Sequence, residues 1–229
     1  MLSDIARRVV PALGRFQVTT DHTHPIAPGT IVAANHSSLI DPGLVLAALA
    51  RVDARDPVVL AAAGLWRVPL LGARLRAESH IPVHRGGPRA AAALELAAQA
   101  LIRGRIVVIY PEGRLPRRRD SADGDPEPFR SGVARLALAT GAPVVPLGQV
   151  GARRVVSGGR IKQLAGVLTA PLRRPRLHVH LGAPLHLTGS QDQATAQAHR
   201  AVAAARRTAA EHVAVRTRVE GEATEALRL

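Results

Sequence analysis

A histidine and an aspartate five positions apart, His36 and Asp41, are the first residues whose types and spacing could do chemistry. They lie in the segment Asn35-His36-Ser37-Ser38-Leu39-Ile40-Asp41, directly after an apolar run. Imidazole titrates near neutral pH, so His36 is a candidate general base, and such a base needs a carboxylate to hold its tautomer. Because Pro42 disfavours helical geometry at Asp41, we expect the segment to form a turn that folds Asp41 back onto His36. Taken alone, the segment also fits a helix N-cap at Asp41 and an ordinary loop histidine.

Two further groups of charged residues are candidate phosphate sites. Glu112, Gly113 and Arg114 come directly after the strongest strand pattern of the chain, and an arginine run over 117–119 comes next. Guanidinium groups can bind phosphate bidentately. Arg85 ends the segment His80-Ile81-Pro82-Val83-His84-Arg85, ahead of a predicted helix whose N-terminus also favours anions. Each group by itself also fits an exposed charged turn.

The elements that must position these residues alternate between strands and helices. Apolar runs predict strands over 31–34, 58–62, 81–83, 105–110, 144–147 and 177–181. Helical periodicity and caps predict helices over 42–50, 88–103, 131–140 and 192–216, with a tail that frays after Glu220. Segments 114–128 and 155–174 are expected to be irregular. This alternation predicts one α/β domain over 1–229, with helices flanking a mostly parallel, mixed central sheet.

Composition narrows the classes of partner. The chain carries a net charge of +14, and every basic residue except Lys162 is arginine. That charge fits lipid phosphates, an acidic membrane, nucleotide thioesters or nucleic acid, and it also fits coding bias. Aromatic residues make up only 2% of the chain, which disfavours base stacking, so no nucleic-acid partner is expected. The absence of cysteine excludes disulfides, thiolate metal sites and a cysteine nucleophile.

No segment has the pattern of a signal peptide or of a membrane-spanning helix. Residues 1–15 lack an apolar core, and the longest uncharged stretch, 136–152, is interrupted by glycine and proline. The segment Leu164–Arg174 fits either a basic amphipathic surface for acidic lipid headgroups or a solvated loop. Two groups could suggest a metal: Asp21, His22 and His24, and separately His178, His180 and His186. His178 and His180 share one strand face, but no carboxylate near them in the sequence completes a set, so no metal site is predicted.

Four blocks in order resemble one family. Asn35-His36-x4-Asp41, Ile81-Pro82-Val83-x-Arg85, Pro111-Glu112-Gly113 and Val144-Val145-Pro146 resemble the four sequence blocks of the bacterial 1-acylglycerol-3-phosphate acyltransferases and their glycerolipid acyltransferase relatives. The resemblance spans roughly residues 31–148, within a motif-bearing core of about 30–150. It implies a glycerolipid acyltransferase-like fold.

The resemblance also implies roles for the residues. His36 would deprotonate the acceptor hydroxyl, which attacks an acyl thioester, and Asp41 would orient and charge-stabilise His36. Asn35 would belong to the substrate site. The glycerol phosphate would be held by Arg85, Glu112, Gly113 and Arg114, whereas Val145 and Pro146 would line the acyl side. Two positions depart from the family pattern. Arg114-Leu115-Pro116 replaces the usual Thr-Arg-Ser, so either Arg114 or Arg117 would bind the phosphate, and His80 replaces a small residue.

The expected reaction moves a fatty acyl group from acyl-CoA or acyl carrier protein to the free hydroxyl of 1-acylglycerol-3-phosphate, making phosphatidic acid for phospholipid biosynthesis. No cofactor is implied beyond the donor substrate. The alternatives are another lipid acceptor on the same machinery, such as a lyso-phospholipid, glycolipid or amino-acid lipid, or a non-enzymatic lipid-binding protein with this fold. The expected location is cytoplasmic, peripheral on the anionic inner face of the cell membrane. The sequence does not indicate an oligomeric state.

Overall fold

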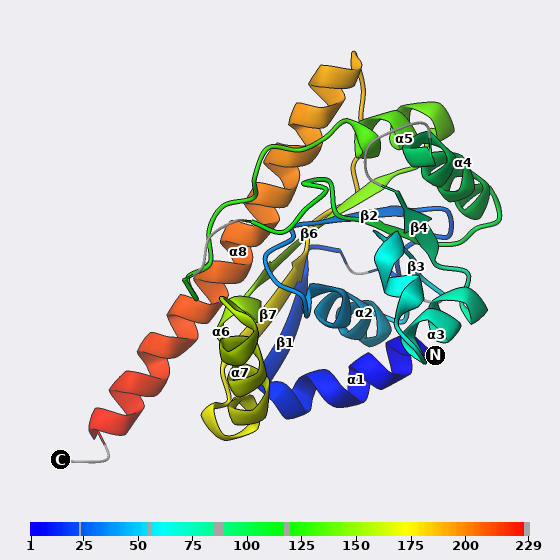
Figure 1. Cartoon of the computed structure of the whole chain (residues 1–229). Coiled ribbons are helices and arrows are strands. Elements are labelled where there is room, and N and C mark those ends of the chain that lie inside the picture. The colour runs from blue at the N-terminus through cyan, green and yellow to red at the C-terminus, as the bar shows by residue number, and fades with distance from the viewer. Residues whose placement is uncertain (23, 55, 85–88, 117–119, 227–229) are drawn as a thin grey trace.

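The computed structural model describes residues 1–22, 24–54, 56–84, 89–116 and 120–226. Seven strands form one mixed sheet in the order β1-β7-β6-β2-β5-β3-β4 (Figure 1). The strands are β1 (Arg15–Thr20), β2 (Ile31–Ala34), β3 (Val58–Ala62), β4 (Ile81–Val83), β5 (Val107–Ile109), β6 (Val144–Val150) and β7 (Arg176–Leu181). Only the β6–β7 pair is antiparallel among these neighbours, which confirms the predicted mostly parallel sheet.

Helices cover both faces of the sheet, and the strand residues alternate between them. The helical elements are α1 (Leu2–Leu13), α2 (Asp41–Arg51), η1 (Ala63–Arg67), α3 (Leu71–Ala77), α4 (Arg89–Ile102), α5 (Gly132–Thr140), α6 (Ala152–Val155), α7 (Arg160–Arg173) and α8 (Gln191–Ala226). Val32 packs in the core with α1 and α2, whereas Ile31 packs in the core with α4, α5 and α8. Because successive strand residues point to opposite faces, a sheet buried on both sides needs these continuous apolar runs.

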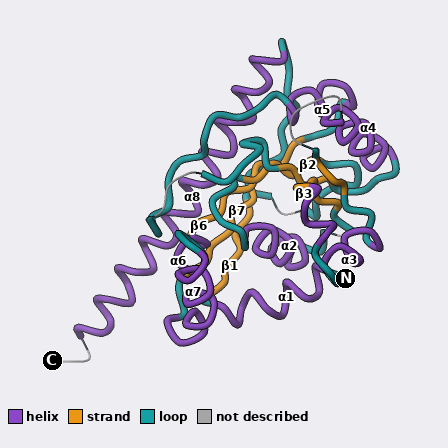
Figure 2. The backbone as a smooth tube through the Cα atoms, in the orientation of Figure 1, coloured by secondary structure: helices purple, strands orange, loops and turns teal. Residues whose placement is uncertain are grey.

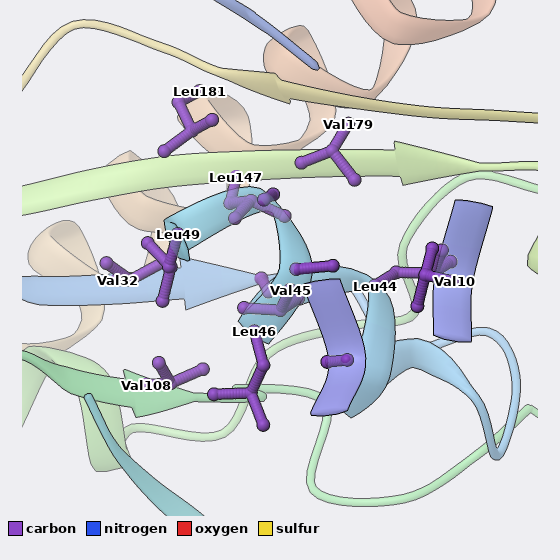
Figure 3. Close-up of a cluster of buried hydrophobic side chains, with 14 of the residues drawn as sticks. Val10, Val32, Leu44, Val45, Leu46, Leu49, Val108, Leu147, Val179 and Leu181 are labelled. Carbon is purple, nitrogen blue, oxygen red and sulfur yellow. The ribbon is translucent and has the colours of Figure 1, made fainter. Parts of the chain in front are cut away.

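Figure 3 shows the first of these cores. Strand residues such as Val108 and Leu147 share one cluster with Leu44, Val45 and Leu49 of α2, and all five side chains are fully buried. This packing fixes α2 against the centre of the sheet. The turn that leads from β2 into α2 is thereby fixed as well.

On the other face, α8 lies directly against β6. A Cβ atom added at Gly148 would meet the backbone nitrogen of Arg206 at 2.1 Å, so only glycine lets the helix approach the strand this closely. This helix runs well beyond the predicted end at residue 216 and beyond the expected fraying point at Glu220. It crosses behind β6 and β7 in Figure 1.

Several elements were missed or misread from the sequence. Segment 160–173 was expected to be irregular, and that prediction was wrong because it forms the helix α7. The predictions also omitted α1, β1, η1, α3 and the short α6. Strand β1 lies at the edge of the sheet and pairs only with β7, which follows it by some 160 positions. None of the helices formed by the described residues is long and apolar enough to cross a membrane.

Candidate active site

His36 lies just beyond the carboxyl end of β2, at the centre of the sheet. The neighbouring strand β5 ends at Ile109 and places Tyr110 and Glu112 beside it. The imidazole ring packs on the ring of Tyr110, with 4.4 Å between centroids, and its side chain is 15% exposed. Open α/β sheets bind their ligands at this edge. The side chain is thus held in place and remains accessible.

The turn after β2 brings Asp41 onto His36, as predicted. Nδ1 of His36 lies 3.0 Å from Oδ2 of Asp41. The same carboxylate oxygen accepts the backbone N–H groups of Ser37 at 2.5 Å and Ser38 at 2.7 Å. The Asp41 side chain is fully buried. The structure places Asp41 in the first turn of α2 after Ile40 at the N-cap, so the alternative reading of Asp41 as the N-cap is wrong. Its carboxylate points back into the turn and orients the imidazole.

Asn35 fastens the start of this turn to β6. Its side-chain oxygen accepts the N–H of Gln149 at 2.8 Å, and its amide nitrogen donates to the Gln149 carbonyl at 3.2 Å. The Gln149 side chain in turn donates to the Asn35 carbonyl at 2.8 Å. Asn35 lines the same pocket as His36, but its amide is engaged by protein. A direct contact of Asn35 with substrate therefore stays a prediction.

Glu112 closes the site from the β5 side. Its Oε1 accepts the backbone N–H of His36 at 2.7 Å, and its Oε2 accepts the N–H of Glu127 at 3.1 Å. Burial raises the pKa of the Glu112 carboxyl to about 7, while the two hydrogen bonds act against this rise. Glu112 therefore joins the segment after β5 to the His36 turn and to the loop at Glu127. Near neutral pH its carboxyl is partly protonated.

The raised pKa of Glu112 predicts a pH-dependent stability. Below its ordinary value of 4.5 the carboxyl is protonated in both the folded and the unfolded chain. As pH rises to about 7, only the unfolded chain ionises, so this group lowers the free energy of unfolding, by about 2 kcal/mol between pH 5 and pH 8. Urea unfolding at both pH values should show this component in the wild type and not in Glu112→Gln. The exposed Glu211→Gln is the matched control, and an identical pH dependence in all three proteins would contradict the assignment.

The predicted phosphate group is only partly visible in the structure. Gly113 has a φ of 72°, and a Cβ there would meet the Arg130 side chain at 2.9 Å, which explains the glycine. Arg114 is half-exposed and pairs with Glu127 at 3.4 Å. Arg85 and Arg117 lie outside the described residues. The choice between Arg114 and Arg117 as the phosphate ligand therefore stays open.

Val145 and Pro146 are buried within β6. Val145 pairs with Val32 across the sheet and belongs to the core shared with α2, and Pro146 pairs with Ala33. Both side chains are covered by protein. Their predicted role in lining an acyl chain remains a prediction.

Arg153 is a site residue that the sequence reasoning missed. It lies in α6, is buried, and donates to the Ser37 carbonyl at 2.9 Å and to the Asp120 carbonyl at 2.5 Å. A second hydrogen bond joins the His36 turn to the end of α6: the Ser38 hydroxyl donates to the carbonyl of Val156, the C-cap of that helix, at 2.7 Å. Nothing in the spacing of the motif points to a residue more than a hundred positions away.

These residues surround a pocket of about 180 Å³. It is lined by Asn35, His36, Ser37, Glu112, Pro116, Gly124, Asp125, Pro126, Glu127 and Arg153. Asp125 pairs with Arg206 at 3.0 Å, and Glu127 pairs with Arg114. The carboxylates of the pocket are thus offset by arginines, which lowers the repulsion of an anionic ligand. Among the residues that the structure describes, no three His, Cys, Asp or Glu side chains are grouped to hold a metal.

The arrangement can carry proton transfer. With Nδ1 of His36 held by Asp41, Nε2 is the ring nitrogen left to take up a proton from a bound hydroxyl. Burial raises the pKa of Tyr110 well above its ordinary value, with the Asp41 carboxylate adding to the rise, so its phenol stays neutral beneath the imidazole. A neutral, apolar floor and a buried carboxylate suit a base that becomes an imidazolium.

The geometry agrees with comparisons to known proteins. In the curated set, the chain is similar to a 1-acyl-sn-glycerol-3-phosphate acyltransferase of Borreliella burgdorferi, with 32% identity over 131 residues, 57% of this chain and 49% of the relative. It is also similar to the chloroplastic 1-acyl-sn-glycerol-3-phosphate acyltransferase BAT2 of Brassica napus, with 25% identity over 130 residues, 56% of this chain and 35% of the relative. The chain thus spans about half the length of the first relative and about a third of the second.

A solved structure shares the fold. The crystal structure of the 1-acyl-sn-glycerophosphate (LPA) acyltransferase PlsC from Thermotoga maritima matches with a TM-score of 0.69 at 20% identity, over 93% of this chain and 78% of that one. The sequence model of the Acyltransferase family matches residues 15–150, which include His36, Asp41 and Glu112. Since this match covers more than half of the chain, the protein belongs to the acyltransferase family.

Proposed function

We propose that this chain transfers a fatty acyl group from an acyl thioester to the free hydroxyl of 1-acylglycerol-3-phosphate, making phosphatidic acid. The observation that carries the proposal is the pair formed by His36 and the buried Asp41, which lines a pocket at the carboxyl edge of the sheet. The names of the curated relatives supply the acceptor. The donor would be acyl-CoA or acyl carrier protein.

In this reaction His36 moves the proton between the acceptor hydroxyl and the leaving thiolate. Nε2 of His36 takes the proton of the acceptor hydroxyl as its oxygen attacks the thioester carbonyl. The tetrahedral intermediate then collapses, the C–S bond breaks, and the thiolate receives the proton held by His36. The products are an ester and a free thiol. No acyl-enzyme is needed, and donor and acceptor are the only other reactants.

Charge in the pocket supports an anionic acceptor. Arg153 lines it directly, and Arg114 pairs with Glu127, which is another of the lining residues. Guanidinium groups suit both a phosphate and the oxyanion of the tetrahedral intermediate. Arg85 and Arg117 remain candidates for the same phosphate on the sequence resemblance alone.

The direct test is acyl transfer from a long-chain acyl-CoA to lysophosphatidic acid by the purified chain, with the free thiol and the lipid product both measured. Product formation that depends on both substrates is the expected result. Acyl carrier protein replaces CoA in a second arm. If the chain makes no lipid product with either donor, the acceptor or the reaction is wrong.

A different lipid acceptor on the same machinery is the second candidate. The departures at His80 and Arg114 favour testing it, because both differ from the family pattern. The His80 side chain is buried and its Nδ1 accepts the N–H of Val59 at 3.0 Å, so the ring is held against β3. Competition between lysophosphatidic acid and non-phosphorylated acceptors separates the two candidates.

A lipid acceptor implies work at a membrane surface. We place the chain on the cytoplasmic, anionic face of the cell membrane as a peripheral protein. The net charge of +14 supports attraction to acidic lipids. Fractionation of cells that express the full chain, with and without a high-salt wash, tests this location.

A further inference from the structure

Helix α7 buries almost none of its own surface. Of its fourteen residues only Ala170 is buried. Ile161 and Leu172 are 88% and 87% exposed, and Leu164 and Leu168 are also mostly exposed. A surface helix of a globular protein usually turns its apolar side chains toward the core. Here the apolar side chains point away from it, which calls for a partner outside the chain.

The four exposed side chains, Ile161, Leu164, Leu168 and Leu172, form one stripe, named here the α7 stripe. With about 100° of rotation per residue, they fall within a band about 100° wide on the side opposite Ala170. Arg160 lies along one flank of the stripe and Lys162 along the other. Arg173 donates to the Thr169 hydroxyl and to the carbonyls of Arg154 and Gly166, and Arg174 follows at the C-cap of the helix. All four basic residues are exposed. No acidic residue occurs between Glu127 and Asp192 in the sequence.

The α7 stripe lies at the same edge of the sheet as the candidate active site. Strand β6 runs parallel to β2, and α6 and α7 follow its carboxyl end just as His36 follows that of β2. Arg153 of α6 is bonded to the turn that holds His36. Figures 1 and 2 show α6 and α7 together beside β6 and β7.

Other exposed apolar side chains lie at this edge. Leu39 is exposed within the turn between His36 and Asp41, and Leu65 and Leu70 are exposed in the segment that follows β3. Leu70 also holds a positive φ of 61°, an uncommon backbone state for leucine. Leu39, Leu65, Leu70 and the α7 stripe thus all lie on connections that follow the carboxyl ends of strands, at the same edge of the sheet as His36.

We infer that the α7 stripe inserts into the surface of an anionic bilayer, with the helix lying in the plane of the membrane. An apolar stripe with a cation on each flank is the pattern that binds acidic lipid headgroups, because the cations meet lipid phosphates while the stripe enters the acyl boundary. The sheet edge with His36 then faces the bilayer that supplies the acceptor. The choice of a lipid partner rests on the proposed function.

Vesicle co-sedimentation tests this surface with the full chain and two matched variants. Leu168→Gln/Leu172→Gln keeps residues that favour helix and removes two exposed side chains. Its partition onto vesicles of phosphatidylglycerol and phosphatidylcholine should fall at least about tenfold. Ile102→Gln removes a side chain that is 81% exposed at the end of α4, at the opposite sheet edge, and should bind like the wild type. Arg160→Gln/Lys162→Gln should weaken binding to anionic vesicles and leave binding to pure phosphatidylcholine unchanged.

Two outcomes of the vesicle assay, and one of a measurement without lipid, would overturn the inference. One is an unchanged vesicle affinity of Leu168→Gln/Leu172→Gln. The other is a loss of binding in Ile5→Gln/Val9→Gln, two exposed residues of α1, without a loss in the α7 variant. Sedimentation velocity of the same proteins without lipid belongs to the test, because a dimer that dissociates in the α7 variant would assign the stripe to a second copy of the chain instead.

A soluble assay separates this inference from the proposed function. With a short-chain, monomeric lysophosphatidic acid and no vesicles, Leu168→Gln/Leu172→Gln should transfer acyl groups at the wild-type rate. With the acceptor embedded in vesicles, its rate should fall in step with its binding. If the wild type is inactive in both assays, the proposed function fails, while the vesicle-binding results still decide the role of α7.

Discussion

His36→Ala is expected to lower kcat/KM for acyl transfer by about a thousandfold, since general-base catalysis is typically worth 10²- to 10⁴-fold. The loss should lie mainly in kcat, because the imidazole stabilises the transition state of proton transfer more than it stabilises the bound substrate. The contact from His36 to Glu112 is made by the backbone N–H and survives the substitution. The fold should therefore persist, and thermal unfolding checks that it does.

His186→Ala is the matched control for this experiment. His186 is exposed and follows Leu185, which bridges to Val144 at the start of β6, the sheet edge opposite the His36 turn, so its loss should leave kcat/KM unchanged. Both variants are measured with saturating and limiting acceptor to separate kcat from KM. A His36→Ala protein that folds and keeps more than about a tenth of the wild-type kcat would remove His36 as the general base.

The contact between His36 and Asp41 was predictable because its signals are local. His36 and Asp41 are five positions apart, and Pro42 shapes the intervening turn. The end of an apolar run then places that turn at the carboxyl edge of the sheet, where the structure has it. Glu112 was predicted as a substrate ligand. In the structure it lines the pocket, and its Oε1 also accepts the backbone N–H of His36.

The contacts that hold the turn in place were not predictable in the same way. Asn35 bonds to Gln149 across 114 positions, and Arg153 reaches Ser37 across 116. Hydrophobic periodicity reports which face of a strand is buried, and it does not report which strand lies next to it. The order that places β6 beside β2 had to come from the structure.

Helix α7 was missed for a different reason. Its apolar residues recur at helical spacing, but Gly166, Pro171 and the flanking arginines also fit an irregular basic segment. Both readings of Leu164–Arg174, an amphipathic surface or a solvated loop, were open on the sequence. The structure decides that the segment is helical, and its outward stripe is what leads to the membrane inference.

The charge of Asp41 is expected to contribute about a hundredfold to the rate, measured as the kcat lost in Asp41→Asn. In the wild type, Oδ2 lies 3.0 Å from Nδ1 of His36 and accepts two backbone N–H groups, from Ser37 and Ser38. An asparagine must keep its oxygen at that place, because its NH₂ group would face those donors. Nδ1–H of His36 therefore still finds an acceptor, and the productive tautomer is retained.

What Asp41→Asn removes is the negative charge next to the imidazolium. A pair of unit charges about 4 Å apart is worth roughly 4 kcal/mol at an effective dielectric constant of 20, and the amide dipole replaces part of this. Stability should change little, whereas Asp41→Ala should lose about 2 kcal/mol or more by leaving two buried N–H groups without an acceptor. Thermal unfolding of both variants separates the loss of charge from the loss of the turn.

The double variant His36→Ala/Asp41→Asn gives the sharpest result. If Asp41 acts only through the imidazole, then once His36 is gone the second substitution has nothing left to affect, and the double variant should have the kcat of His36→Ala alone. Additive losses would mean that Asp41 acts on the substrate by another route. In that case the pair could not be a base with its orienting carboxylate, and the 3.0 Å contact would serve the architecture of the turn alone.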